Sequence, residues 1–178
     1  LCDVDGRLAR GNRRREPTLR RALISISGLA RLESRWPVFA GVEMGSPRQP
    51  DASVEIVEAV SGACLCLRRE MFERLHGFDE AYFLHCEDLD LCRRVRDSGS
   101  RVAIANSLRA RHLQGASSRA RPIFVERHKH RGMWRYFRKY DPAARNPLLR
   151  AIVWCGIWTH FALTASAMAL KRMGARPA

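Results

Sequence analysis

Hydrophobic and polar residues follow two different periods along this chain, and the period predicts where strands and helices form. Residues 54–60 alternate apolar with acidic positions over part of their length, which predicts a strand. Residues 61–68 read as a second, buried strand that is entered through a glycine. Residues 101–105 predict a further strand.

Between these strands the apolar residues recur every three or four positions, as they do on one face of a helix. Residues 69–76 fit a short helix with Phe72 and Leu75 facing inward and Gly77 at its end. A second helix starts at an acidic cluster and closes at Ser98-Gly99. Strand, helix, helix and strand in this order indicate an α/β protein.

The segments before residue 54 carry a weaker pattern. Residues 19–32 have a helical period that Gly28 and the serines weaken. Residues 37–53 hold three prolines and two glycines among polar residues, which predicts a long surface loop.

The acidic cluster at the start of the second helix is the first candidate for chemistry. Asp88 is followed three, four and seven positions later by Leu91, Cys92 and Val95, so it heads the apolar face of that helix. Glu87 lies roughly 100° further around and has different surroundings. A carboxylate held near a helix N-terminus can act as a general base. The alternative is that these acids only complement the helix dipole.

The C-terminal part combines a basic and aromatic segment with an apolar one. Residues 126–140 predict a helix that contacts lipid head groups, a phosphorylated acceptor or RNA, or that packs its aromatic side on the domain. Residues 151–170 contain no side chain that is charged at neutral pH. This length fits a membrane-spanning helix, a helix in the membrane interface, or a buried or oligomer-forming helix.

Composition narrows the class of partner. The 178 residues include 32 Lys and Arg against 18 Asp and Glu, a formal charge of +14, which favours a nucleic acid, an anionic membrane surface or a phosphorylated substrate. The six cysteines form no CxxC pair, and their spacing matches no common zinc module. With no secretory segment at the N-terminus, we expect a reducing, cytosolic setting. Because the sequence opens with Leu1, we also expect a fragment of a longer protein.

Five sequence elements in a fixed order resemble the C-terminal half of bacterial family 2 glycosyltransferases, with the closest likeness to rhamnosyltransferase-like members. The resemblance is dense from about residue 57 to residue 118. The elements are Ser61-Gly62-Ala63-Cys64, Arg68-Arg69-Glu70-Met71-Phe72, Gly77-Phe78-Asp79-Glu80, the run from Tyr82 to Arg94 that contains Glu87-Asp88-Leu89-Asp90, and His112-Leu113-Gln114-Gly115-Ala116-Ser117-Ser118.

This resemblance implies an α/β, Rossmann-like GT-A fold that binds a nucleotide sugar and a divalent cation, Mg²⁺ or Mn²⁺, and transfers the sugar with inversion. It implies that Asp88 deprotonates the acceptor hydroxyl, that Glu87 assists, and that His112 binds the metal or approaches the donor diphosphate. It also implies that Gly62, Ala63 and Asp90 line the acceptor and donor cleft.

The same resemblance predicts two regions. Residues 1–125 are expected to be the C-terminal half of a GT-A domain without its nucleotide-binding half, and residues 126–178 a basic, aromatic helix followed by a membrane-associating helix. The expected partners are a nucleotide-sugar donor, a lipid-linked or polysaccharide acceptor and the membrane surface, at the cytoplasmic face. A nucleic acid is not expected. A basic nucleic-acid-binding module and an inactive membrane-tethered scaffold are the alternatives.

Overall fold

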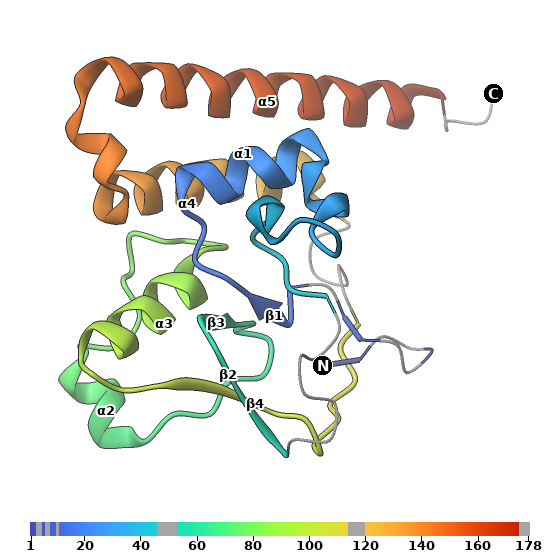
Figure 1. The fold of residues 1–178 in the computed structure, drawn as a ribbon. Helices are drawn as coiled ribbons and strands as arrows, with labels where there is room; N and C mark the ends of the chain where they lie inside the picture. The colour runs from blue at the N-terminus through green and yellow to red at the C-terminus, as the bar shows by residue number, and fades with distance from the viewer. Residues whose placement is uncertain (3–4, 6–7, 10, 46–52, 114–119, 175–178) are drawn as a thin grey trace. The chain divides into compact units, whose positions relative to one another are not determined.

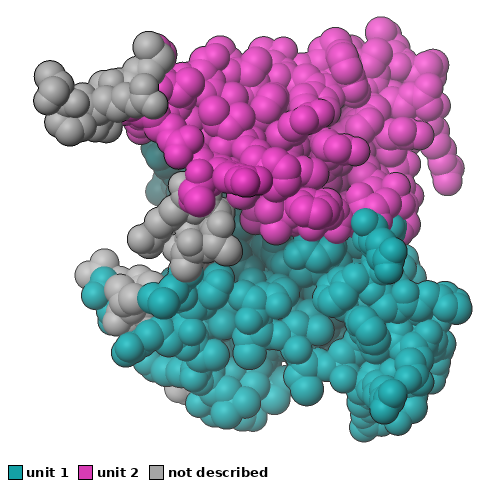
Figure 2. Space-filling model, turned by 180° about the vertical axis from the view of Figure 1, so that it is seen from behind, with its two compact units in different colours: residues 1–80, 87–114 teal, residues 81–86, 115–178 magenta. Residues whose placement is uncertain are grey.

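The computed structural model describes residues 1–2, 5, 8–9, 11–45, 53–113 and 120–174 (Figure 1). The chain divides into two compact units, coloured separately in Figure 2. Unit 1 consists of Leu1–Glu80 and Glu87–Gln114, and unit 2 of Ala81–Cys86 and Gly115–Ala178. The second unit therefore includes a short segment from the middle of the chain, in addition to the C-terminal region.

Helices and strands are mixed along the chain, as the sequence predicts. Unit 1 contains β1 (Arg13–Arg14), α1 (Leu19–Ser27), η1 (Leu29–Leu32), η2 (Pro37–Phe39), β2 (Val54–Val57), β3 (Ala59–Val60), α2 (Arg69–Arg74), α3 (Glu87–Asp97) and β4 (Val102–Ala105). Unit 2 contains α4 (Pro122–Tyr140), η3 (Pro142–Arg145) and α5 (Pro147–Gly174).

The strands of unit 1 form two small antiparallel sheets. β1 pairs with β3, and β2 pairs with β4 in a register that sets Val54 opposite Ala105. The predicted strand over residues 54–60 is confirmed as β2 and β3. All named strand pairs in the described residues are antiparallel, and one isolated parallel bridge joins Cys2 to Arg111. The described residues therefore show a mixed α and β architecture without an assembled parallel Rossmann-like sheet.

The buried face of β2 carries an acid. Glu55 and Val57 are buried, whereas Val54 and Ile56 point to solvent. The alternation that predicted the strand thus places Glu55 inside, where it accepts a hydrogen bond from Arg13 Nε at 3.2 Å. A buried carboxylate needs such a partner, because desolvation otherwise disfavours its charge.

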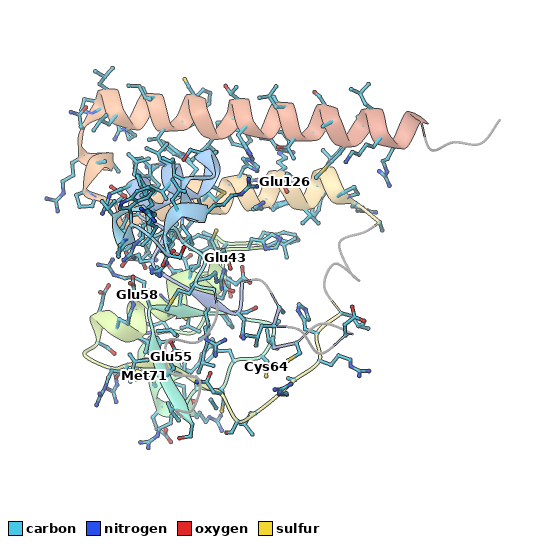
Figure 3. The ribbon with its side chains drawn as sticks, turned by 45° about the vertical axis from the view of Figure 1, so that its right-hand side comes forward. Glu43, Glu55, Glu58, Cys64, Met71 and Glu126 are labelled. Atoms are coloured by element: carbon cyan, nitrogen blue, oxygen red, sulfur yellow. The ribbon has the colours of Figure 1, made fainter. Side chains whose placement is uncertain are left out.

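Two local predictions are wrong. Residues 61–68 form no strand, and Cys64 (labelled in Figure 3) and Cys66 are exposed. Phe72 does not face inward: it is 37% exposed and packs edge-to-face on Phe78 with ring centroids 5.8 Å apart. In both places the apolar residues predict a buried face, but sequence periodicity does not show whether another element covers that face.

The helix predicted over residues 19–32 divides at Gly28. Thr18 caps α1 by accepting a hydrogen bond from the Arg21 backbone N–H, and Gly28 ends the helix with a left-handed φ of 79°. Glycine adopts this conformation without the steric penalty that a Cβ brings. The 3₁₀ turn η1 follows directly.

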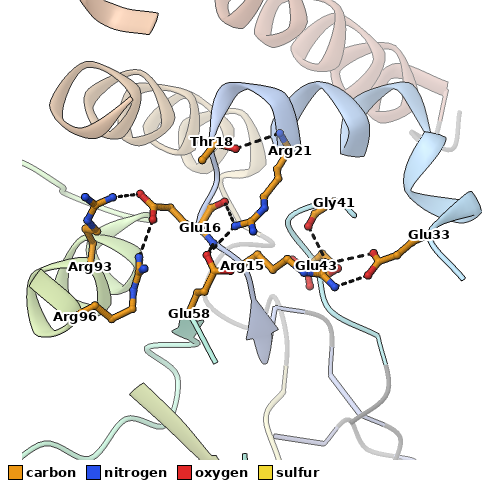
Figure 4. Close-up of polar contacts among 10 residues, drawn as sticks. All are labelled: Arg15, Glu16, Thr18, Arg21, Glu33, Gly41, Glu43, Glu58, Arg93 and Arg96. Carbon is orange, nitrogen blue, oxygen red and sulfur yellow. Dashed lines mark hydrogen bonds and ion pairs between the residues drawn. The ribbon is translucent and has the colours of Figure 1, made fainter. Parts of the chain in front are cut away.

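Ion pairs join Glu16 and Arg21 to other elements of unit 1 (Figure 4). Glu16 binds Arg93 and Arg96 of α3, the second at 2.9 Å. Arg21 binds Glu58 at 2.7 Å. Because these contacts join residues more than 30 positions apart, they stabilise the tertiary arrangement rather than any single helix.

In unit 2, α4 and α5 lie side by side and run antiparallel, with η3 connecting them (Figure 1). His130 of α4 and His160 of α5 meet at 2.9 Å between Nε2 and Nδ1. The apolar segment predicted over residues 151–170 is confirmed as helical and lies inside α5. Among the described residues one helix, from Pro147 to Arg172, is long and apolar enough to cross a membrane, and its most apolar 18 residues have a mean hydropathy of 1.3.

His130 is the most deeply buried polar side chain of unit 2. Its Nδ1 lies 2.8 Å from the Glu126 carbonyl oxygen, which can only accept, so Nδ1 carries the hydrogen and the neutral ring accepts from His160 through Nε2. Burial lowers the pKa of His130 below its ordinary value, although the backbone hydrogen bond and the Glu126 charge act in the opposite direction.

This lowered pKa predicts an acid-sensitive helix pair. The unfolded chain binds a proton at His130 at a higher pH than the folded chain does, so the stabilisation is fully present above about pH 6.5 and is lost as the pH falls through the folded value. We expect chemical denaturation between pH 7.5 and 5 to show a loss of stability that His130→Gln reduces. His76→Asn, at an exposed histidine, is the control, and an equal pH dependence in both variants would contradict this account.

Candidate active site

Asp88 is the centre of a small polar cluster in unit 1. It lies in the first turn of α3 and is buried, with 8% of its surface exposed, as its position at the head of the apolar face predicts. Arg14 Nη2 binds Asp88 Oδ2 at 2.5 Å, and the same nitrogen donates to the Val60 carbonyl oxygen at 2.7 Å. The Gly62 backbone N–H also donates to Asp88 Oδ2, at 2.9 Å.

The hydrogen bonds of Asp88 leave one oxygen partly available. Arg14 and Gly62 both bind Oδ2, whereas Oδ1 accepts one bond, from the Leu89 backbone N–H at 2.8 Å. An ionised carboxylate offers about two acceptor positions on each oxygen. Oδ2 is therefore saturated among the described residues, and Oδ1 retains one position for an incoming hydroxyl group.

Glu87 has different surroundings, as its angular offset from Asp88 predicts. Its side chain is half-buried, and Oε2 has no hydrogen-bond partner among the described residues. Burial raises the pKa of Glu87, and the nearby charge of Asp88 raises it further. Glu87 is thus easier to protonate than an ordinary glutamate, whereas Asp88 is held by a guanidinium and a backbone amide.

Gly62 lies directly against Asp88, so the structure brings these two predicted site residues together. A Cβ at position 62 would lie 3.2 Å from the Asp88 Cβ, and a side chain there would press on the carboxylate. The neighbouring Ala63 is exposed and donates its backbone N–H to Ser61 Oγ at 3.3 Å. The absence of a side chain at Gly62 is what lets its N–H reach Asp88.

Asp90 has a structural environment in unit 1. It is fully buried, and Oδ2 accepts a hydrogen bond from Arg94 Nε at 2.7 Å. Arg94 also donates to the carbonyl oxygens of Leu75 and Gly77, which follow α2. Asp90 and Arg94 therefore attach α3 to the end of α2, and a cleft position for Asp90 remains a prediction.

His112 follows β4 at an anchored point of the backbone. Its N–H donates to the Cys2 carbonyl oxygen at 2.9 Å, and its side chain is partly exposed. The described residues contain no group of three or more His, Cys, Asp or Glu side chains that could hold a metal ion. One histidine does not by itself bind a divalent cation firmly, and His112 is part of no such group in the described part of the chain.

In the described part of the chain the cysteines belong to no group of three or more side chains that could hold a metal ion. Cys2, Cys86 and Cys92 are buried, and burial raises the pKa of the Cys92 thiol. A metal ligand must be a thiolate, which such burial disfavours.

A cavity of about 440 Å³ in unit 1 lies beside α3, and Asp88 is not among its lining residues. Leu91, Cys92 and Val95 line it, together with the 101–105 segment and residues 64–67. Asp88 heads the helix face that these three residues continue. The lining of the cavity is mainly apolar.

A strained turn leads into Glu87. His85 and Cys86 have φ values of 67° and 68°, a left-handed conformation that non-glycine residues rarely adopt and that costs roughly 1–2 kcal/mol for each residue. Both residues pack against Gly132 of α4, where a Cβ would lie 2.7 Å from the His85 carbonyl oxygen. The turn is thus held in unit 2, and its last residue is covalently joined to the first residue of α3.

Sequence reasoning missed Arg14 and Gly132. Arg14 stands among several consecutive arginines, and nothing in that run distinguishes the one that reaches Asp88. Gly132 interrupts a helical pattern, which is a recognisable signal that another backbone approaches closely.

Comparison with known proteins shows a similarity to one family. Residues 48–135, just under half of the chain, match the sequence profile described as glycosyltransferase like family 2. This matched region contains Gly62, Ala63, Glu87, Asp88, Asp90 and His112. Residues 48–135 are therefore similar to the family 2 glycosyltransferases.

Individual relatives support a rhamnosyltransferase-like member. The chain is 32% identical over 74 residues to the rhamnosyltransferase WbbL of Escherichia coli (strain K12), covering 42% of this chain and 28% of that protein. It is 30% identical over 111 residues to an N-acetylglucosaminyl-diphospho-decaprenol L-rhamnosyltransferase of Mycobacterium tuberculosis (strain ATCC 25618 / H37Rv), covering 56% of this chain and 36% of that protein.

A third relative is named for a pathway rather than for a reaction. The O-antigen biosynthesis protein RfbC of Myxococcus xanthus is 42% identical over 65 residues, covering 36% of this chain and 5% of that protein. The matches thus span about a third or less of the length of these relatives. No solved structure matches the chain.

The contact at Gly132 predicts opposite effects for two glycine-to-alanine changes in helices. Gly132→Ala should destabilise the chain by about 1–3 kcal/mol, since the His85 backbone must shift. Gly156→Ala in α5 should instead stabilise by up to about 1 kcal/mol, because no atom lies within 4 Å of the added Cβ. Denaturant unfolding of both variants measures the change in the free energy of unfolding. Equal changes would show that the close contact between position 132 and the His85 backbone does not lower stability.

Proposed function

We propose that this chain carries the acceptor side and the general base of an inverting glycosyltransferase. The enzyme would move a sugar, with rhamnose as the first candidate, from a nucleotide-sugar donor to a lipid-linked or polysaccharide acceptor in cell-envelope glycan synthesis. The observation that carries the proposal is the geometry of Asp88, a buried carboxylate with one oxygen saturated and the other able to accept one more hydrogen bond.

In the proposed reaction the acceptor hydroxyl donates its hydrogen bond to Asp88 Oδ1. As the hydroxyl oxygen attacks the anomeric carbon, its proton passes to this carboxylate, and the bond between that carbon and the leaving diphosphate breaks with its electron pair. Arg14 and Gly62 hold Asp88 through Oδ2, so the reacting oxygen keeps a fixed direction. Attack opposite the leaving group gives inversion.

Glu87 is proposed to assist beside this base. Its raised pKa and its unpartnered Oε2 are suited to a hydrogen bond with a hydroxyl group of the acceptor. Gly62 and Ala63 are proposed to leave room for that acceptor, since neither carries a large side chain.

The family's divalent cation, Mg²⁺ or Mn²⁺, is an expectation that the described residues do not fit by themselves. His112 is this chain's candidate ligand, and we derive no step of the reaction through the cation. The nucleotide-sugar donor is proposed to bind mainly outside this chain.

The names of the relatives favour this class over the alternatives. One relative acts, by its name, on an N-acetylglucosaminyl-diphospho-decaprenol, which is a lipid-linked sugar. We propose an acceptor of the same chemical kind for this chain, at the cytoplasmic face of the cell membrane. None of the names of the relatives given above refers to a nucleic acid.

The proposal predicts a specific loss in the Asp88→Asn variant. In an enzyme that joins this chain to the family's nucleotide-binding half, we expect the transfer rate to fall by at least about 10²-fold, because an amide cannot take the acceptor proton. Binding of the nucleotide sugar should change little.

The matched control is Asp97→Asn, which removes an exposed carboxylate from the same helix. Thermal unfolding of both variants separates a catalytic loss from a folding defect, since Asp88→Asn also weakens the ion pair with Arg14. Transfer near the wild-type rate in a folded Asp88→Asn enzyme would remove Asp88 as the base.

A further inference from the structure

Contacts at both ends and at the middle hold α5 along α4. At one end η3 joins the two helices directly. At the middle His130 meets His160, and at the other end Arg172 Nη2 donates to the Ala120 carbonyl oxygen at 3.3 Å. These three contacts lie along the whole length of α4, so the axes of the two helices stay nearly parallel (Figures 1 and 3). If α5 tilts relative to a membrane, α4 tilts with it.

Length alone does not decide how α5 meets a membrane. Its 28 residues extend for roughly 40 Å at about 1.5 Å per residue, which exceeds a hydrocarbon thickness of about 30 Å. A spanning helix and a helix in the membrane plane are both compatible with this length.

The charges of α4 distinguish a spanning helix from a helix in the membrane plane. If α5 spanned the bilayer, the contact between His130 and His160 would set the middle of α4 near the bilayer centre. Each Arg or Lys side chain there costs about 2.5–3.5 kcal/mol, so four of them cost roughly 10 kcal/mol or more. The four basic residues within about five positions of His130 are Arg127, Lys129, Arg131 and Arg135.

The outer face of α5 is free of charge and mostly apolar, with Thr159 and Ser166 as exposed polar residues on it. From Ala151 to Leu170 the helix carries no Asp, Glu, Lys or Arg, and its exposed apolar side chains continue to both ends. They include Leu148, Ile152, Leu163 and Leu170. The opposite stripe, Val153, Ile157, Phe161 and Met168, is half-buried.

We propose that the α4–α5 pair lies in the plane of an anionic lipid surface, with the outer face of α5 in the acyl boundary and the basic side chains of α4 at the head groups. This inference rests on the membrane association within the proposed function and specifies its geometry. Partial immersion removes apolar surface from water while the arginines stay hydrated. The complementary sign of the charges commits the partner to a bilayer with anionic lipids rather than to a second copy of this cationic chain.

Two cysteine reporters test the geometry. Leu148→Cys and Leu170→Cys lie at opposite ends of α5 and start from equal exposure, 67% each. The background replaces the exposed Cys64, Cys66 and Cys155 by serine, and this background without a reporter is the labelling control. The chain is bound to vesicles of phosphatidylcholine and phosphatidylglycerol, and a membrane-impermeant maleimide is added outside.

An in-plane helix places both reporters at the same depth on the outer side, so we expect the vesicles to slow the labelling of both to the same extent. In the free chain both reporters should label fully, above the background. A spanning helix would place them on opposite sides, and labelling of one reporter alone would overturn the proposal. A chain that self-associates without binding the vesicles would also overturn it.

Charge reversal tests the lipid chemistry. Arg127→Glu with Arg131→Glu should weaken binding to the anionic vesicles by at least about 25-fold, since each basic residue near such a surface contributes about 1 kcal/mol. The matched control reverses two exposed arginines of unit 1, Arg74 and Arg101, and should change binding by less than about twofold. An equal loss in both variants, or a loss in neither, would remove α4 from the membrane surface.

These experiments do not depend on sugar transfer. If the helix pair binds in the membrane plane but the Asp88→Asn enzyme still transfers sugar, Asp88 is not the base and the membrane geometry is unaffected. The reverse result would overturn only the geometry.

Discussion

The buried ion pair between Arg14 and Asp88 is the interaction on which the candidate site depends. Their side chains are only 14% and 11% exposed, and one guanidinium nitrogen reaches both Asp88 and the Val60 carbonyl oxygen. Removing either partner would leave a charge buried without compensation, which is far more destabilising than loss of a surface pair. The pair therefore connects β1, β3 and the start of α3, and it also orients the carboxylate proposed as the base.

Two neighbouring carboxyl groups have separate properties because the chain gives them different partners. Asp88 is bound by a guanidinium and a backbone amide, whereas burial without a partner for Oε2 raises the pKa of Glu87. A strained turn precedes both, and Gly132 gives that turn room. Backbone strain of this kind persists only where the surrounding structure holds it, and it is common beside functional groups.

The pairing of α4 with α5 limits the environments that suit the apolar residues 151–170. Taken alone, residues 151–170 fit three different environments. Once α5 is attached along a helix rich in arginine and lysine, the desolvation of those charges opposes a spanning orientation, and a lipid surface becomes the better partner. The same pairing buries His130, which links the stability of these two helices to pH.

The sequence by itself determined the helices that start at Glu87 and cover residues 126–140 and 151–170, the strands at residues 54–60 and 101–105, and the inward direction of Asp88. These features follow from local periodicity and helix-end chemistry, which neighbouring residues specify. Only the tertiary structure decided that Arg14 binds Asp88, that residues 61–68 are exposed rather than a buried strand, and that His130 meets His160. Such outcomes depend on which distant segments pack together, and periodicity along the chain carries no information about a partner 30 or more positions away.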